Sequence, residues 1–311
     1  MPLSTPQSIG GDTAAAVPAG VSSGHRDVKG KILEGLLIFA LFGSLLILGV
    51  LIFDLIRRSW PIWTERPGAF LTGPLNSANA AQAGVWQGIK GTIQLALIVA
   101  IVAIPLGTAC AVYLEEYAGK SRLAAFTRLN VRNLAGVPSI VYGLLGLAIF
   151  VQTLGLGSTV WAGGLALSAL VLPIVIITAS EALRAVPYSV REGALGVGAT
   201  RWETTRTHVL PAAAPGILTG VVLSLARAAG EAAPILLVGA ATGLLRTGQQ
   251  SFFEQLSSSF TAMPVVIFSY ARQPGEAFRE ITAAASVVLM VLVLFMNAFA
   301  IWLRNRYQRK W

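Results

Sequence analysis

Charged side chains are scarce in this chain. Asp, Glu, Lys and Arg make up 12% of its 311 residues, whereas a soluble globular domain carries about 25%. Residues 133–180 contain none of the four, a run of 48 residues, and one membrane crossing takes about 20 apolar residues. With a mean hydropathy of +0.70, the composition excludes a soluble enzyme and predicts a protein that crosses a membrane several times.

Side chains for covalent, metal or nucleotide chemistry are also few. Cys110 is the single cysteine, which excludes a disulfide scaffold. The two histidines, His25 and His208, fall in an expected tail and an expected loop, so we predict no His-based metal site or catalytic triad. Gly119-Lys120-Ser121 matches the end of a phosphate-binding loop, but Leu114 replaces its required first glycine. We therefore expect no enzyme activity and no bound cofactor or metal in this chain.

Long uncharged runs predict an all-α polytopic membrane protein with six transmembrane helices. The two runs on either side of residues 154–158 give the third and fourth helices, because the glycines of this segment interrupt the pattern. The six expected spans are Ile32–Ile56, Lys90–Leu114, Asn133–Thr153, Thr159–Ser180, Pro215–Gly239 and Ile281–Leu303.

The distribution of basic residues predicts that both termini lie in the cytoplasm, because cytoplasmic loops are enriched in Lys and Arg. Six arginines fall on the opposite side in this arrangement: Arg57, Arg58, Arg66, Arg246, Arg272 and Arg279. Fifteen basic residues fall on the side of the termini: Arg26, Lys29, Lys31, Lys120, Arg122, Arg128, Arg132, Arg184, Arg191, Arg201, Arg206, Arg304, Arg306, Arg309 and Lys310.

The predicted cytoplasmic connection between spans 4 and 5, residues 181–211, carries several helix signals. Ser189-Val-Arg-Glu192 and Thr200-Arg-Trp-Glu203 both fit a capping box, Gly196 and Gly198 interrupt them, and Pro211 follows. These signals predict two short helices around a glycine turn. Short helices without a core must pack on something, either the membrane bundle itself or a partner protein. A DNA-binding helix-turn-helix is disfavoured because this loop has no supporting domain, so we expect no nucleic-acid partner.

The same loop resembles the EAA loop of ABC importer permeases, E-A-A-x3-G-x9-I-x-L-P. Gly193 replaces the first Ala of that pattern, and His208 replaces the Ile. The resemblance implies that the loop forms coupling helices, which bind in a groove of an ATPase subunit. The coupling residues that it assigns are Glu192, Gly193, Ala194, Gly198, Leu210 and Pro211.

Two further phrases, NLAGVPSIVYGLLGLAIFV at residues 133–151 and LARAAGEAAPI at residues 225–235, resemble the phosphate importer permeases of the PstA type. That resemblance implies a type I ABC importer permease fold in the bacterial inner membrane. It implies three partners: a PstB-type ATPase that binds ATP and Mg, a second permease of the PstC type, and an external PstS-type phosphate-binding protein. A permease for sulfate or molybdate remains the nearer alternative, and an ATP-independent anion channel or intramembrane enzyme the more distant one.

The expected organisation has four parts. Residues 1–30 form a disordered cytoplasmic tail, residues 31–84 the first transmembrane helix with an external loop, residues 85–303 the permease domain, and residues 304–311 a basic cytoplasmic tail. Residues 240–280 lie outside in this arrangement, and Met263–Ala271 is too short to cross. An amphipathic or re-entrant segment packed on the bundle is the expectation for it.

Arg227 and Glu231 are the ionisable residues placed deep in a predicted span. Four residues apart, they would share one face of a helix. Charges inside a membrane usually face a bundle interior or a water-filled path. Two interpretations remain open at this point. The pair is structural and only joins helices, or Arg227 lines an anion path whose positive potential Glu231 moderates.

Overall fold

The computed structural model describes residues 28–119, 121–243 and 252–307, and every regular element in these ranges is helical. The expected tail of residues 1–30 therefore falls almost wholly outside the described residues. The elements are α1 Val28–Glu65, α2 Pro67–Thr72, η1 Ala80–Gln82, α3 Trp86–Val112, η2 Tyr113–Tyr117, α4 Arg122–Ala135, α5 Ser139–Gly146, η3 Leu147–Thr153, α6 Val160–Arg184, α7 Tyr188–Gly196, α8 Arg201–Thr204, η4 Thr205–Val209, α9 Leu210–Gly230, α10 Ala233–Val238, α11 Phe252–Leu256, α12 Met263–Ala271 and α13 Glu276–Tyr307.

The described residues contain 5 continuous helices that are long and apolar enough to cross a membrane, and a sixth crossing is supplied if one bent pair counts as a span. The continuous helices are Gly30–Glu65, Trp86–Tyr117, Val160–Arg184, Arg201–Gly230 and Glu276–Arg306. The first of them runs nine residues past the predicted end at Ile56. An all-α fold with up to six spans is thus confirmed.

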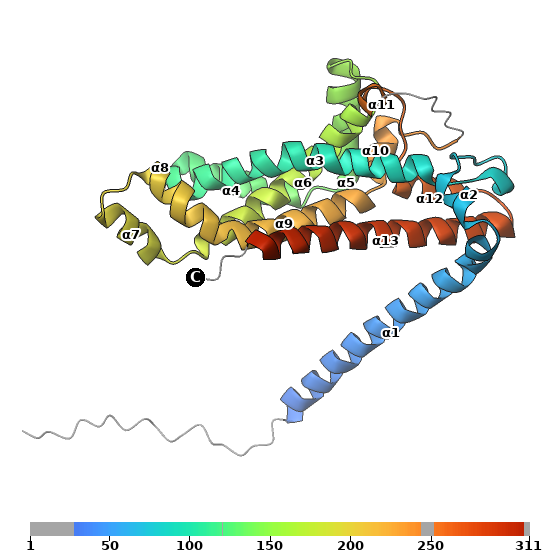
Figure 1. Ribbon diagram of the computed structural model, residues 1–311. Coiled ribbons are helices and arrows are strands. Elements are labelled where there is room, and N and C mark those ends of the chain that lie inside the picture. Colours follow the sequence, from blue (N-terminus) through green and yellow to red (C-terminus); the bar gives the residue numbers. More distant parts are fainter. Residues whose placement is uncertain (1–27, 120, 244–251, 308–311) are drawn as a thin grey trace, which may run out of the picture. The chain divides into compact units, whose positions relative to one another are not determined.

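The third predicted span is not one straight helix. Arg122–Ala135 and Ser139–Thr153 meet at 101°, and the chain breaks between them (Figure 1). Pro138 is the cause, because its ring disfavours a helical backbone at the residue before it. The third span, predicted over Asn133–Thr153, therefore contains a break: its helix begins at Ser139, and the residues before the break belong to α4.

The fifth predicted span, Pro215–Gly239, was also wrong at both ends. Its helix begins at Arg201 and ends at Gly230. Glu231 has an extended backbone, with φ −81° and ψ 120°. A separate short helix, α10, follows with Pro234 in its first turn. Gly230 and Pro234 flank the break, and both residue types disfavour a continuing helix.

The chain divides into two compact units at Ile52 and Phe53. In the first unit, helix α1 carries large apolar side chains such as Phe39, Phe42 and Leu46 in exposed positions. A helix that is apolar on all sides belongs in a membrane or in a large core. This part of the helix is therefore suited to crossing a bilayer.

In the second unit, the long helices α3, α6, α9 and α13 lie side by side (Figure 1). Helix α3 packs on α6, α6 on α9, and α9 on α13. Gly164 of α6 permits one of these close approaches, because a Cβ at this position would lie 2.7 Å from Cγ2 of Ile98. Small residues bring membrane helices close in this way. The bundle holds the connecting segments that carry the candidate site.

Helix α12 is buried rather than amphipathic. Met263, Val265 and Val266 have no exposed surface, and the helix packs on α3 and α13. The expected packing on the bundle is confirmed, but the expected polar face is missing. Tyr270 also lies in α12, where its hydroxyl donates to the Gly84 carbonyl at 2.6 Å. Burial raises the pKa of Tyr270 to about 12, so this hydroxyl stays protonated and keeps its hydrogen bond at physiological pH.

Candidate functional site

The loop between α6 and α8 begins with helix α7, Tyr188–Gly196. Pro187 precedes its first residue, and no side chain caps its N-terminus. The predicted capping box Ser189–Glu192 was therefore wrong, because the helix starts at Tyr188, two residues too early for Ser189 to cap it. The second predicted box is confirmed. The Glu203 N–H donates to the Thr200 hydroxyl at 3.3 Å, and the Thr200 N–H donates to the Glu203 carboxylate at 2.8 Å.

The second helix of this loop is not a short, separate one as predicted. Helix α8 continues through the wide π turn η4 into α9, so that Arg201–Gly230 is one helix of 30 residues. Pro211 therefore lies within a helix and does not close the segment. The π turn ends two residues before Pro211, which has no N–H for the helix ladder. Such turns commonly accommodate an interrupted ladder.

The six predicted coupling residues occupy two places on these elements. Glu192 and Gly193 lie on the exposed side of α7, whereas Ala194 is buried. Gly198 follows the helix with φ +91°, a conformation that favours glycine. Leu210 and Pro211 form the start of α9, beyond the π turn.

Helix α7 packs partly on its own chain and leaves an apolar surface uncovered. It contacts α8 and η4, which bury Ala194. Tyr188, Leu195, Val197 and Trp202 remain 71%, 47%, 87% and 58% exposed. Four large apolar side chains in a polar loop are typical of a surface that another protein covers. We call these four residues the coupling surface.

An ion pair between Glu116 and Arg191 anchors α7 to the membrane helices, and neither residue was predicted to belong to a site. Arg191 Nη2 donates to Glu116 Oε1 at 2.7 Å, and the two side chains are only 16% and 10% exposed. The same guanidinium donates to the carbonyls of Leu183 and Val186 at 2.9 Å. Arg191 thus joins α7, the end of α6 and the π turn η2 that extends α3.

Glu115, the neighbour of Glu116, joins the ends of three helices. It accepts two hydrogen bonds from Arg184 of α6, at 2.8 and 2.7 Å, and lies 3.5 Å from Nε of Arg128 in α4. The Arg184 contacts are bidentate, the geometry in which Arg pairs most specifically with a carboxylate. One sequence signal for this cluster existed: Glu115 and Glu116 are adjacent acidic residues at the end of an apolar run.

Arg227 and Glu231 do meet, although not on one helix. Arg227 lies in the last turn of α9, and Glu231 follows it in extended backbone. Arg227 Nε lies 3.3 Å from Glu231 Oε1, with side-chain exposures of 46% and 21%. A cation at a helix C-terminus is also favoured by the helix dipole. The guanidinium is half open on the surface of this chain, so it remains accessible to a second ligand.

The two sequence segments that resemble PstA-type permeases, residues 133–151 and 225–235, pack against each other. Helix α5 comes from the first and α10 from the second, and the two helices are in contact. A Cβ at Gly143 would lie 2.8 Å from the Pro234 Cα, so only glycine allows this approach. Packing on α5 thereby fixes the segment that follows Glu231.

Known proteins are similar to this chain over most of its length. Residues 103–309 match the family model described as binding-protein-dependent transport system inner membrane component. The chain is 34% identical over 252 residues to "Phosphate transport system permease protein PstA 1" of Mycobacterium tuberculosis (strain CDC 1551 / Oshkosh), covering 81% of this chain and 78% of that protein. It is 36% identical over 222 residues to the protein named PstA of Yersinia pestis, covering 71% and 72%.

A solved bacterial ABC transporter involved in the import of the acidic polysaccharide alginate has a similar fold. Its chain is 17% identical, with a TM-score of 0.57, and the match covers 90% of this chain and 100% of that one. The fold is therefore that of a type I ABC importer permease, and the protein is an integral membrane protein. The chain belongs to the family of binding-protein-dependent transport system inner membrane components, and within it to the permeases of the PstA type.

Proposed function

We propose that this chain is the membrane-spanning subunit of an ATP-driven importer that carries inorganic phosphate across the bacterial cytoplasmic membrane. The similarity to two proteins named phosphate transport permeases, over more than two thirds of each, carries the proposal. It is supported by an arginine at the broken end of a membrane helix, because guanidinium groups bind phosphate oxygens in a bidentate manner.

The energy for transport comes from a separate ATPase of the PstB type, which binds ATP and Mg, and this chain holds no cofactor. The coupling surface of Tyr188, Leu195, Val197 and Trp202 is the proposed contact with that ATPase. Its apolar side chains, with Glu192 exposed on the same helix, suit a groove with an apolar floor and a polar rim. A second permease of the PstC type and an external PstS-type phosphate-binding protein complete the proposed assembly.

The proposed orientation places both termini and α7 in the cytoplasm. The excess of basic residues on that side supports it. The structure brings the C-terminal end of α13 to the end of the bundle where α7 lies (Figure 1). Arg304 Nη1 donates to the Thr219 hydroxyl, midway along α9, at 3.2 Å. The direction of α13 supports placing its C-terminal end and α7 on one side of the membrane.

Arg227 is the proposed anion contact along the path, with Glu231 as its modulator. Arg227 lies about 24 Å from Pro211 along the same helix, since 16 residues rise about 1.5 Å each. One continuous helix thus links the coupling region to Arg227. A displacement of the coupling loop by the ATPase would be transmitted to the anion contact through that helix.

Transport by the reconstituted complex tests the proposed function. The chain is co-expressed with its ATPase and second permease, purified, and placed in proteoliposomes with the binding protein outside and ATP inside. We expect uptake of radiolabelled phosphate that requires ATP and is unaffected by excess sulfate or molybdate. Uptake that sulfate or molybdate abolishes would contradict phosphate as the substrate, and uptake without ATP would contradict the coupling to an ATPase.

A further inference from the structure

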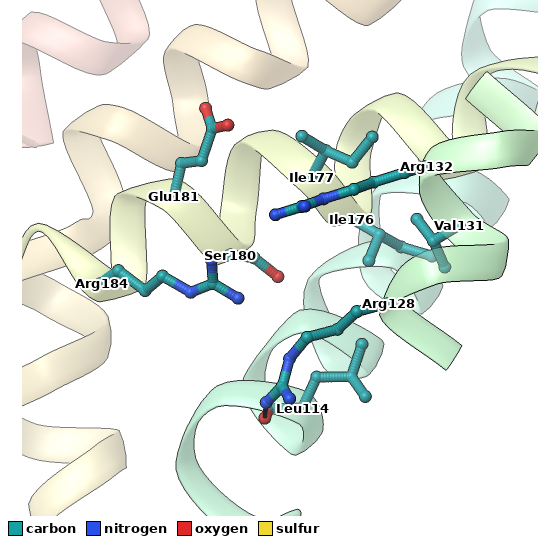
Figure 2. A pocket seen from close by; sticks show the side chains of 9 residues that line it. All are labelled: Leu114, Arg128, Val131, Arg132, Ile176, Ile177, Ser180, Glu181 and Arg184. Atoms are coloured by element: carbon teal, nitrogen blue, oxygen red, sulfur yellow. Dashed lines mark hydrogen bonds between the residues drawn. The ribbon is translucent and has the colours of Figure 1, made fainter. Parts of the chain in front are cut away.

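A small cavity lies where α4 meets α6, away from Arg227. Its volume is about 30 Å³, enough for two or three water-sized atoms, so a larger ligand would place part of its atoms inside and the rest at the exposed rim. Three arginines line it, Arg128 and Arg132 from α4 and Arg184 from α6, together with Ser180 and Glu181 (Figure 2). Apolar residues of η2, α4 and α6 form the remaining wall. The cavity is therefore a polar recess among the ends of membrane helices.

Several donors around this cavity have no hydrogen-bond partner among the described residues. Ser180 is 92% buried, and no such partner is seen there for its hydroxyl. By contrast, Ser168 in the same helix donates to the Gly164 carbonyl at 2.7 Å. Arg128 Nε is buried without a hydrogen bond but lies 3.5 Å from Glu115 Oε1, whereas the described part of the chain offers the exposed Arg132 guanidinium no hydrogen bond or ion pair. Buried polar groups are usually satisfied, so the Ser180 hydroxyl is placed for a ligand in the cavity that Arg132 also lines.

The charges indicate which ligand that is. Glu115 neutralises part of the cavity, because it pairs with both Arg184 and Arg128. Glu181 lies at the exposed rim, and Arg132 is exposed there too. Three guanidinium groups against two carboxylates leave one positive charge in surplus. Guanidinium and hydroxyl donors together suit an acceptor with several oxygens and a negative charge, which describes an oxyanion such as a phosphate group.

We propose that this cavity binds one phosphate group, held by Arg132 and the Ser180 hydroxyl, with Arg128 and Arg184 behind them. Its position beside Glu115 puts the ligand next to the cluster that joins α3, α4 and α6. Two sources share this chemistry: inorganic phosphate, and the headgroup of an anionic phospholipid. Only the first source rests on the proposed function, since a phospholipid headgroup would bind whatever the transported substrate is.

The test measures binding of two probes to the purified, detergent-solubilised complex. The probes are radiolabelled inorganic phosphate, followed by equilibrium dialysis, and phosphatidylglycerol, followed by native mass spectrometry. Arg132→Gln removes the surplus charge at an exposed position, and Ser180→Ala removes the unpartnered hydroxyl. Arg122→Gln is the matched control, because Arg122 is an exposed arginine of the same helix that does not line the cavity.

We expect Arg132→Gln to weaken the binding of one of the two probes about tenfold, which corresponds to about 1.4 kcal/mol, and Ser180→Ala to weaken the binding of the same probe several-fold. Arg132→Lys should recover part of the loss, and Arg122→Gln should change neither affinity. The weakened probe identifies the source. Unchanged binding of both probes in Arg132→Gln, or an equal loss in Arg122→Gln, overturns the proposal. Such a result leaves the proposed function intact if ATP-dependent uptake persists.

Discussion

Glu116 and Arg191 are 75 residues apart in the sequence, yet their side chains form a 2.7 Å ion pair that holds α7. Arg191 adds hydrogen bonds to two carbonyls at the end of α6. The carboxylate extends from the π turn that follows α3. A force applied to α7 by a bound ATPase therefore reaches α3 and α6 through one guanidinium.

Breaking this link should uncouple the complex without preventing its assembly. Arg191→Gln removes the ion pair and its carbonyl bonds, at a cost of about 2 kcal/mol, while the coupling surface stays unchanged. We expect the ATPase to co-purify as before, and transport per ATP hydrolysed to fall severalfold. The double exchange Glu116→Arg with Arg191→Glu should recover part of the coupling, because it restores the ion pair but not the carbonyl bonds. If Arg191→Gln leaves the transport per ATP hydrolysed unchanged, the Glu116–Arg191 ion pair does not couple ATP hydrolysis to transport.

The exposed face of α7 should bind the ATPase directly. Glu192→Lys reverses a charge on this face without touching the membrane helices. We expect weaker co-purification of the ATPase or loss of substrate-stimulated ATP hydrolysis. Glu276→Lys is the control, since it reverses an exposed charge at the first residue of α13. That residue lies at the opposite end of α13 from Arg304. Wild-type assembly and stimulation in Glu192→Lys would exclude a coupling role for Glu192.

Replacing Gly193 and Gly198 by alanine should have opposite effects on the stability of the loop that contains α7. Gly193 lies inside helix α7, and the space that a Cβ would occupy there is open, so Gly193→Ala should stabilise the helix by about 0.5–1 kcal/mol. Gly198 has φ +91°, so Gly198→Ala should cost about 1 kcal/mol or more. Protease susceptibility of the loop in the purified complex measures both effects. Equal susceptibility in the two variants would contradict this difference.

The orientation can be checked by cysteine labelling in intact cells, in a Cys110→Ser background. A membrane-impermeant maleimide should fail to label Leu195→Cys in α7, because the proposed orientation places that residue in the cytoplasm. It should label Ser259→Cys, an exposed residue of the segment assigned to the outside. Permeabilised cells lacking the ATPase provide the control, in which both cysteines should react. Labelling of position 195 alone in intact cells would reverse the orientation.

The pattern of uncharged runs predicted the membrane helices better than it predicted where those helices break. Uncharged runs mark the membrane helices because apolar length is what a bilayer requires. Beyond the 101° bend after Ala135 and the end of α9 at Gly230, α5 and α10 pack against each other. Gly143 and Pro234 carry that contact, and the hydropathy of a sequence window contains no information about it. Pro138 and Pro234 are local signals for these breaks, because a proline disfavours a helical backbone at the residue before it.

The candidate site was predictable only where its residues are close in sequence. Arg227 and Glu231 are four residues apart, and their pairing holds even though the helix ends between them. The Glu115 and Glu116 clusters depend on arginines up to 75 residues away, so the adjacent acidic pair marks the place but no local pattern indicates its partners. The Thr200–Glu203 box is a local motif and was found.

In the proposed function, phosphate contacts Arg227 as it crosses the membrane. Arg227→Gln should abolish most uptake while the complex still assembles, and Arg227→Lys should restore transport only in part, because it keeps the charge but not the planar fork. A purely structural pair predicts instead that the loss comes from Glu231 left without its partner. In that case, removing both charges would relieve the defect.

The most direct measurement is therefore phosphate uptake by the double variant Arg227→Gln with Glu231→Gln, normalised to the amount of assembled complex in proteoliposomes. Our account predicts that the double variant assembles normally and still fails to transport phosphate. Recovery of uptake to the wild-type level would contradict it and would assign Arg227 and Glu231 a structural role alone.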